Sequence, residues 1–64
     1  SFRQYLTNIR INEAKRLLHD GQLTIKEIAY HVGFRNPSYF TRIFKEMTKI
    51  SPREYRMHIR EGME

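Results

Sequence analysis

Three polar side chains, those of Ser38, Arg42 and Lys45, recur at a spacing that places them on one face of a helix over residues 37–47. The planar guanidinium group of Arg42 can donate two hydrogen bonds at once, which suits the O6 and N7 acceptors of guanine in a DNA major groove. The hydroxyl of Ser38 can donate or accept, so it distinguishes bases less sharply. This face is therefore suited to hydrogen bonding with base edges.

The residues around this face complete a predicted set of contacts. Pro37 and the ring of Tyr39 offer apolar surface, for example to a thymine methyl group. Arg35 precedes the helix and Lys45 lies two turns into it, so both are better placed for phosphates, as is Thr41. We predict base contacts from Pro37, Ser38, Tyr39 and Arg42, and phosphate contacts from Arg35, Thr41 and Lys45.

Structural roles compete with these functional ones. Tyr39 could pack on the surface of the preceding helix, and Arg42 could form an exposed pair with Glu46, worth only a few tenths of a kcal/mol. Lys45 could be ordinary solvated surface. The opposite face of the helix is interpreted as core and not as a ligand pocket, and it contains Phe40, Ile43, Phe44 and Met47.

Start and stop signals mark two helices that would position these residues. Thr24 and Glu27 form a capping box, and Gly33 permits a positive φ in the turn that ends the first helix. Asn36 can cap the second helix, with Pro37 at its first position, where a missing N–H costs nothing. Residues 24–47 are therefore a predicted helix-turn-helix, an arrangement that places its second helix in the major groove.

A further helix is predicted on each side of this motif. The first runs from about Phe2 to Leu18 and ends before Gly21, which can take the left-handed conformation. Its buried stripe is predicted to be Ile11, Ala14, Leu17 and Leu18, with Phe2, Leu6 and Ile9 extending the apolar side. The last helix begins after Ser51, with Pro52 first and Glu54 closing a second capping box. The free amides that follow Thr24 and Ser51 are additional candidates for phosphate contact.

The predicted fold class is all-α, with four helices that form a homeodomain-like helix-turn-helix preceded by a long linker helix. The 64 residues make one domain near the lower size limit for a self-sufficient core, and no cysteine is present to stabilise it. We expect this domain to divide into a linker helix (1–20), the helix-turn-helix (24–47), a closing helix (51–60) and a tail (61–64).

The charge of the chain is positive and unevenly distributed. The net charge is +5, and residues 33–60 carry seven basic side chains against two acidic ones. A positive field of this kind indicates a polyanionic partner. On charge alone, a solvated basic face is an equal alternative.

Catalytic and metal-binding chemistry finds no support in the residue pattern. His19, His31 and His58 lie in different predicted elements, without the spacing of metal ligands and without a cysteine partner. No Ser/His/Asp arrangement or phosphate-binding glycine loop is present either. We therefore expect no enzyme, no catalytic residue, no metal and no cofactor.

The chain also lacks the signals of a membrane or secreted protein. No apolar run approaches the roughly 20 residues of a membrane span, and no signal peptide is recognisable. We expect a cytoplasmic setting. Because the chain starts at Ser1 and not at a methionine, we interpret it as a piece of a longer protein.

Four segments in order resemble the C-terminal part of AraC/XylS-type bacterial transcription regulators. These segments are Arg10-Ile11-x-x-Ala14-x-x-Leu17-Leu18, Ile25-x-x-Ile28-Ala29-x-x-Val32-Gly33-Phe34, Ser38-Tyr39-Phe40-x-x-x-Phe44-Lys45 and Ser51-Pro52-x-x-Tyr55-Arg56. They cover about Ser1 to Arg56. The DNA-binding unit of that family has two helix-turn-helix motifs joined by a linker helix, and each motif enters one major groove. The resemblance implies that this chain is the linker helix, the second motif and the closing helix, without the first motif.

The same resemblance carries base contact onto Pro37, Ser38 and Arg42, and it implies that the first helix is chiefly a spacer. Two positions depart from the family pattern. Lys49 stands where a glycine often follows the recognition helix, so a positive φ there would carry a cost. Pro37 stands where a polar side chain could hydrogen-bond a base, which leaves less direct readout.

The leading hypothesis is sequence-specific binding of double-stranded DNA by part of a bacterial transcription regulator. A second hypothesis is a basic protein-interaction module that docks an acidic partner such as RNA polymerase. A third is a cationic peptide on a membrane surface, against which the capping devices at three helix starts argue. Any small-molecule or phosphorylation input would lie outside this chain, and no membrane partner is expected.

Overall fold

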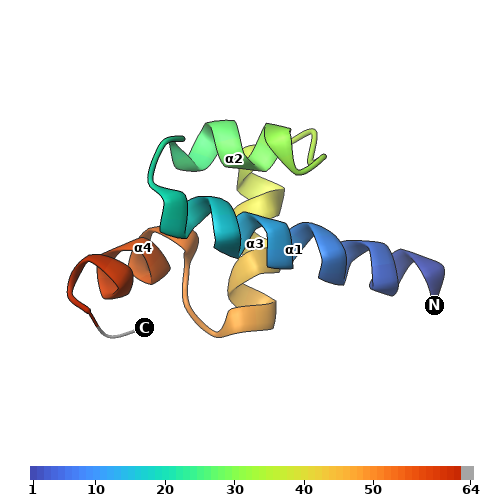
Figure 1. Ribbon diagram of the computed structural model, residues 1–64. Coiled ribbons are helices and arrows are strands. Elements are labelled where there is room, and N and C mark those ends of the chain that lie inside the picture. Colours follow the sequence, from blue (N-terminus) through green and yellow to red (C-terminus); the bar gives the residue numbers. More distant parts are fainter. Residues whose placement is uncertain (63–64) are drawn as a thin grey trace.

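The computed structural model describes residues 1–62 and contains, within them, four helices and no strand (Figure 1). The helices are α1 (Phe2–Asp20), α2 (Ile25–His31), α3 (Pro37–Thr48) and α4 (Pro52–Arg60). The prediction of an all-α helix-turn-helix preceded by a long helix is confirmed. Of the predicted tail, residues 61 and 62 form a turn, and residues 63 and 64 lie outside the described residues.

The predicted capping boxes start α2 and α4. The Glu27 amide donates to Thr24 Oγ1 at 3.1 Å, and the Thr24 amide donates to Glu27 Oε1 at 2.9 Å. Ser51 and Glu54 repeat this exchange at 3.1 and 3.0 Å. Each box satisfies two backbone donors that a helix start would otherwise leave without a partner.

The helix α3 starts with a different cap. Asn36 Oδ1 accepts hydrogen bonds from the amides of Ser38 and Tyr39 at 2.8 and 3.1 Å. Pro37 occupies the first helical position, as predicted, and no acidic residue lies in the first turn. The start of α3 therefore keeps its positive dipole end without a neutralising carboxylate.

Left-handed residues end two of the helices. Gly21 has φ 75° and donates its amide to the Leu17 carbonyl, so α1 continues to Asp20. The observed end is two residues beyond the approximate end at Leu18 and matches the expected bound of the linker helix (1–20), because the helix ends where the chain first takes positive φ. Lys49 caps α3 at φ 77°, so the positive φ considered at this position is present, and its cost stays a prediction.

The core lies where the four helices meet. Its buried side chains are Ile11, Ala14, Leu17, Leu18, Ile28, Ala29, Val32, Phe34, Phe40 and Phe44. A row of aromatic rings runs through it from Phe34 to Phe40, Phe44 and Tyr55, with ring centroids 5.3, 5.8 and 5.5 Å apart. These contacts fix α3 to the turn before it and to α4.

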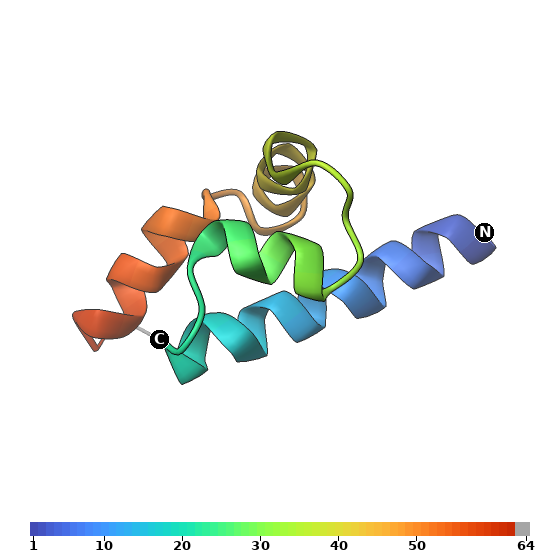
Figure 2. The same ribbon diagram turned by 90° about the horizontal axis from the view of Figure 1, so that it is seen from above.

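The N-terminal half of α1 projects beyond the other helices in both views (Figures 1 and 2). As a result, part of the predicted apolar side is exposed: Phe2 is 78% exposed and Ile9 is 46% exposed. Met47, predicted to face the core, is 41% exposed, because the last turn of α3 lies beside this projecting segment and not over the core. The core therefore begins at Ile11 along α1.

Candidate nucleic-acid interface

The outer face of α3 brings the predicted polar residues together. Ser38, Arg42 and Lys45 are exposed on one side of the helix, while Phe40 and Phe44 on the other side are fully buried. Pro37 and Thr41 are half-buried at the edges of this face, and Arg35 is exposed in the turn before α3. All seven predicted contact residues therefore lie on α3 or directly before it.

Tyr39 combines the two roles considered for it. Its ring lies against Phe34, with centroids 6.0 Å apart and planes tilted by 51°, yet half of the residue (51%) is exposed. Packing on one edge holds the ring, and the other edge remains open to a ligand. The structural and the functional interpretation of Tyr39 are thus compatible.

Arg42 lies near Glu46, one turn further along α3. Its Nε is 3.6 Å from Glu46 Oε2, and the two side chains are 71% and 61% exposed. This separation is too long for a well-formed hydrogen bond, and an exposed pair of this kind contributes only a few tenths of a kcal/mol. Glu46 therefore cannot hold the guanidinium group away from a base.

The starts of α2 and α4 are less suited to phosphate than the sequence suggested. Their capping boxes use two amides each and place a carboxylate beside the helix start. The hydrogen bond from the Thr24 amide lowers the pKa of Glu27, and that from the Ser51 amide lowers the pKa of Glu54, so both carboxylates stay ionised at neutral pH. Of α2, α3 and α4, only α3 has no carboxylate in its first turn, a property that it shares with α1.

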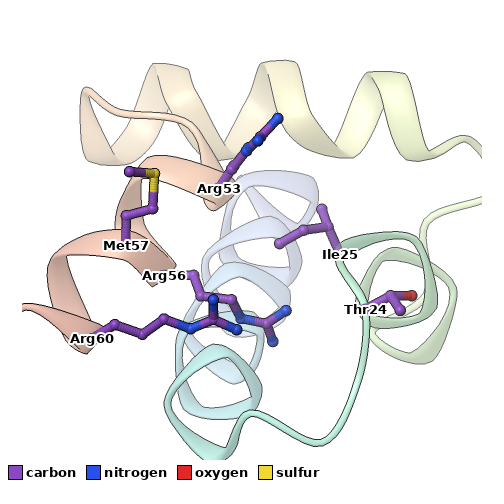
Figure 3. Close-up of a pocket in the computed structure, with 6 residues that line it drawn as sticks. All are labelled: Thr24, Ile25, Arg53, Arg56, Met57 and Arg60. Atoms are coloured by element: carbon purple, nitrogen blue, oxygen red, sulfur yellow. The ribbon is translucent and has the colours of Figure 1, made fainter.

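A basic hollow of about 490 Å³ lies beside the start of α2, lined by Thr24, Ile25, Arg53, Arg56, Met57 and Arg60 (Figure 3). Arg53 extends toward α3, whereas Arg56 and Arg60 extend toward the start of α2. Arg56 Nη2 donates to the Leu23 carbonyl at 2.7 Å, and its buried Nε has no hydrogen-bond partner within residues 1–62. Arg56 thus ties α4 to the loop before α2.

No binding role was predicted for these three arginines, although Arg56 belongs to the fourth segment of the family resemblance. Arg53, Arg56 and Arg60 are spaced i, i+3 and i+7, which places them on one side of a helix. This spacing could have indicated a basic side of the last helix. The bond from Arg56 to Leu23, 33 positions away, had no counterpart in any local pattern.

The described part of the chain offers no metal site: no group of three or more His, Cys, Asp or Glu residues within it could hold an ion. His19 instead packs edge-on against the Tyr55 ring, with centroids 5.9 Å apart. No helix within residues 1–62 is long and apolar enough to cross a membrane.

Comparison with known proteins adds a decisive observation. A family model described as a helix-turn-helix domain, of the AraC type, matches residues 1–58. The chain belongs to the AraC-type helix-turn-helix family. This confirms the resemblance found in the sequence, and it makes the chain a DNA-binding domain of the kind that bacterial transcription regulators contain.

Relatives of this AraC-type domain are known in several bacteria. The uncharacterized HTH-type transcriptional regulator YijO of Escherichia coli is 44% identical over 55 residues, which are 86% of this chain and 19% of that protein. The TCP pilus virulence regulatory protein of Vibrio cholerae is 41% identical over 54 residues, 84% of this chain and 20% of that protein. The chain thus spans about a fifth of the length of these relatives. No solved structure gives a significant match.

The AraC-type domain is also similar to part of a protein with an enzyme's name. The histidine kinase P4 of Formosa agariphila is 33% identical over 52 residues, which are 81% of this chain but only 4% of that protein. The similarity is therefore confined to a small part of the kinase. The matched regulators are not enzymes.

Proposed function

We propose that this AraC-type domain binds double-stranded DNA in a sequence-specific way, as part of a bacterial transcription regulator, with α3 in the major groove. The observation that carries this proposal is the contrast across α3. Its inner face is anchored by fully buried aromatic rings, and its outer face presents exposed Ser38, Arg42 and Lys45. A helix held rigidly on one side can present hydrogen-bond donors to base edges at fixed positions.

Arg42 is the main base-contacting residue in this proposal. It is exposed, its pairing with Glu46 is weak, and its fork can donate to guanine O6 and N7. Ser38 adds a second hydrogen bond in the first turn, while Pro37 and the open edge of Tyr39 supply apolar contact. The domain would thus recognise few bases directly, chiefly one guanine.

Phosphate contacts from Arg35, Thr41 and Lys45 position the helix. Arg35 and Lys45 are exposed at the two sides of the base-contacting residues, and Thr41 is half-buried between them. Each neutralised phosphate contributes about 0.9 to the slope of log affinity against log salt concentration. We therefore expect the isolated domain to bind weakly, with an affinity that falls steeply as salt is added.

Binding of a fluorescent duplex, selected from a random-sequence pool, tests this proposal. Arg42→Ala is expected to weaken binding to the selected duplex by about ten- to one-hundredfold, the discrimination of one bidentate base contact, and to weaken binding to an unrelated duplex much less. Lys45→Ala is the matched control. It should weaken both duplexes equally and lower the salt slope by about 0.9.

Equal losses on both duplexes for Arg42→Ala would make Arg42 a phosphate contact and remove the proposed base readout.

The second candidate function, docking of an acidic protein such as RNA polymerase, is supported by the arginines that line the hollow beside α4. Amide NMR shifts of residues 35–45 that stay unchanged on addition of duplex DNA would favour that alternative over DNA binding.

A further inference from the structure

A second basic hollow lies beside the start of α3, on the side toward the projecting half of α1. It measures about 640 Å³ and is lined by three arginines, with Arg3 and Arg10 from α1 and Arg35 from the turn before α3. Thr7, Asn36 and Tyr39 add polar groups to its wall, and no acidic side chain lines it. Three guanidinium groups therefore share one hollow without a carboxylate.

Arg10 is held in this hollow by specific packing. Its guanidinium carbon lies 6.0 Å from the centroid of the Phe34 ring, and the residue is half-buried. Gly33 lets Arg10 lie close to the turn, since a Cβ atom there would lie 3.0 Å from Arg10 Nε and the side chain would have to shift by a few tenths of an ångström. The guanidinium group is thus fixed by a cation–π contact and a close glycine, which leaves its N–H donors available.

None of the three arginines has an anionic partner in the part of the chain that the structure describes. The ion pairs recorded there involve Arg16 with Glu13 and Arg42 with Glu46. Converging like charges repel one another, and a shaped site of one sign attracts a counter-ion. Guanidinium groups bind phosphate oxygens with two parallel hydrogen bonds, so a phosphate is the anion that suits this site.

The hollow adjoins the proposed groove contacts, because Asn36 and Tyr39 at the start of α3 form part of its wall. In Figure 2, the N-terminal half of α1 extends past the turn between α2 and α3, which leads into α3. A DNA strand that borders the groove occupied by α3 would continue over this side of the molecule.

We propose that Arg3, Arg10 and Arg35 bind a backbone phosphate of DNA next to the groove that α3 enters. The linker helix α1 is then a DNA-contacting element and not only a spacer. This inference rests on the proposed function, because it assigns a further phosphate to the same complex.

Arg3→Gln in the 64-residue chain tests the inference, because Arg3 is exposed outside the core. We expect it to weaken binding of the selected duplex by about two- to fivefold, the scale of an exposed charge pair, and to lower the salt slope by less than about 0.9, because Arg10 and Arg35 still contact the phosphate. Lys15→Gln, which removes the same charge from α1 outside the hollow, is the matched control and should leave both quantities unchanged.

Duplexes that carry one neutral methylphosphonate at each position of the flank locate the phosphate. One position should weaken binding of the wild-type chain and cause a smaller loss with Arg3→Gln, in which Arg10 and Arg35 still contact the phosphate. Arg10→Lys keeps the charge but loses the fork and the stacking, so it should weaken binding while the salt slope stays the same; thermal melting checks that it is folded.

The outcomes separate the inference from the proposed function. A wild-type chain that binds the duplex, with Arg3→Gln indistinguishable from Lys15→Gln, overturns the role of α1 and leaves DNA binding by α3 intact. An Arg3→Gln loss that is additive with every methylphosphonate also overturns the assigned phosphate. Absence of duplex binding by the wild-type chain overturns both proposals.

Discussion

The inner and outer faces of α3 are built from residues that recur every three or four positions along one helix, yet the two faces differ in burial and polarity. Phe40 and Phe44 are fully buried in a row of aromatic rings, whereas Ser38, Arg42 and Lys45 are exposed and form no contact that fixes them strongly. Burial of apolar surface stabilises the fold, and free polar groups are available to a ligand. Stability and binding should therefore be separable in this domain, residue by residue.

The largest effect is expected on the inner face. Phe44→Ala removes a ring that contacts both Phe40 and Tyr55, and such truncations in a core cost about 3–5 kcal/mol. A core of this size supplies only about that much stability, so the variant should be largely unfolded at 25 °C by circular dichroism. Lys45→Ala on the outer face is the control and should change the free energy of unfolding by less than about 0.5 kcal/mol. Similar losses of folding stability for both variants would show that the two faces do not differ in their contribution to the fold.

At the end of α3, Lys49→Gly should separate strain from charge. Lys49 holds φ 77°, which costs a non-glycine residue about 1–2 kcal/mol relative to glycine. The variant should therefore unfold at a denaturant concentration that corresponds to about 1 kcal/mol more stability. Lys49→Ala removes the same charge and keeps the strain, so it should bring no gain. A gain with alanine would show that charge repulsion, and not the backbone, sets the cost.

On the outer face, Glu46→Gln should affect binding and hardly affect stability. It removes a carboxylate beside Arg42 whose pairing is exposed and weak. Duplex affinity should rise by about threefold at low salt, on the scale of one exposed charge interaction, and the free energy of unfolding should change by at most about 0.5 kcal/mol. Asp20→Asn, at the far end of α1, should leave the affinity unchanged. A lower affinity with Glu46→Gln would mean that Glu46 holds Arg42 in place for binding.

The smallest expected effect is one of pH on the helix starts. The pKa values of Glu27 and Glu54 are lowered in the folded chain by hydrogen bonds from the Thr24 and Ser51 amides. Since a depressed folded pKa stabilises the fold only above the unfolded pKa, their contribution is full above about pH 4.3 and is lost as the pH falls below it. The protection factors of the amides at the starts of α2 and α4, which correct for the intrinsic pH dependence of exchange, should then fall in acid, while those at the start of α3, capped by Asn36, should not change.

The double variant Glu27→Gln with Glu54→Gln is the control for this titration. Glutamine can still close a capping box but does not ionise. Glu13, whose pKa is lowered by its hydrogen bond with Arg16, still titrates in this variant, so an acid effect near Glu13 in α1 should remain. An unchanged acid response at α2 and α4 in the double variant would refute the assignment.

Local features of this fold were predictable from the sequence. The two capping boxes, the Asn36–Pro37 start and the left-handed Gly21 and Lys49 each depend on residues within about one helical turn, so a short pattern determines them. The seven predicted contact residues share the region of α3 for the same reason. Their individual roles in DNA binding stay predictions.

Features that depend on how the helices cross were not predictable. Met47 and Ile9 have the spacing of core residues, but within residues 1–62 no other helix covers them fully, and they are 41% and 46% exposed. The bond from Arg56 to Leu23 and the meeting of Arg3, Arg10 and Arg35 join residues that are far apart in the chain. Periodicity identifies the face of a helix, and it carries no information on which other helix lies opposite.

Contact between Arg42 and a guanine in the major groove can be tested directly by changing the guanines of the selected duplex. Each guanine is replaced in turn by 7-deazaguanine, which lacks only the N7 acceptor of the major groove, and binding is measured for the wild-type chain and for Arg42→Ala. We expect one guanine whose replacement weakens wild-type binding by about tenfold and leaves binding by Arg42→Ala unaffected. Equal effects on both proteins at every position, or no effect at any, would contradict it.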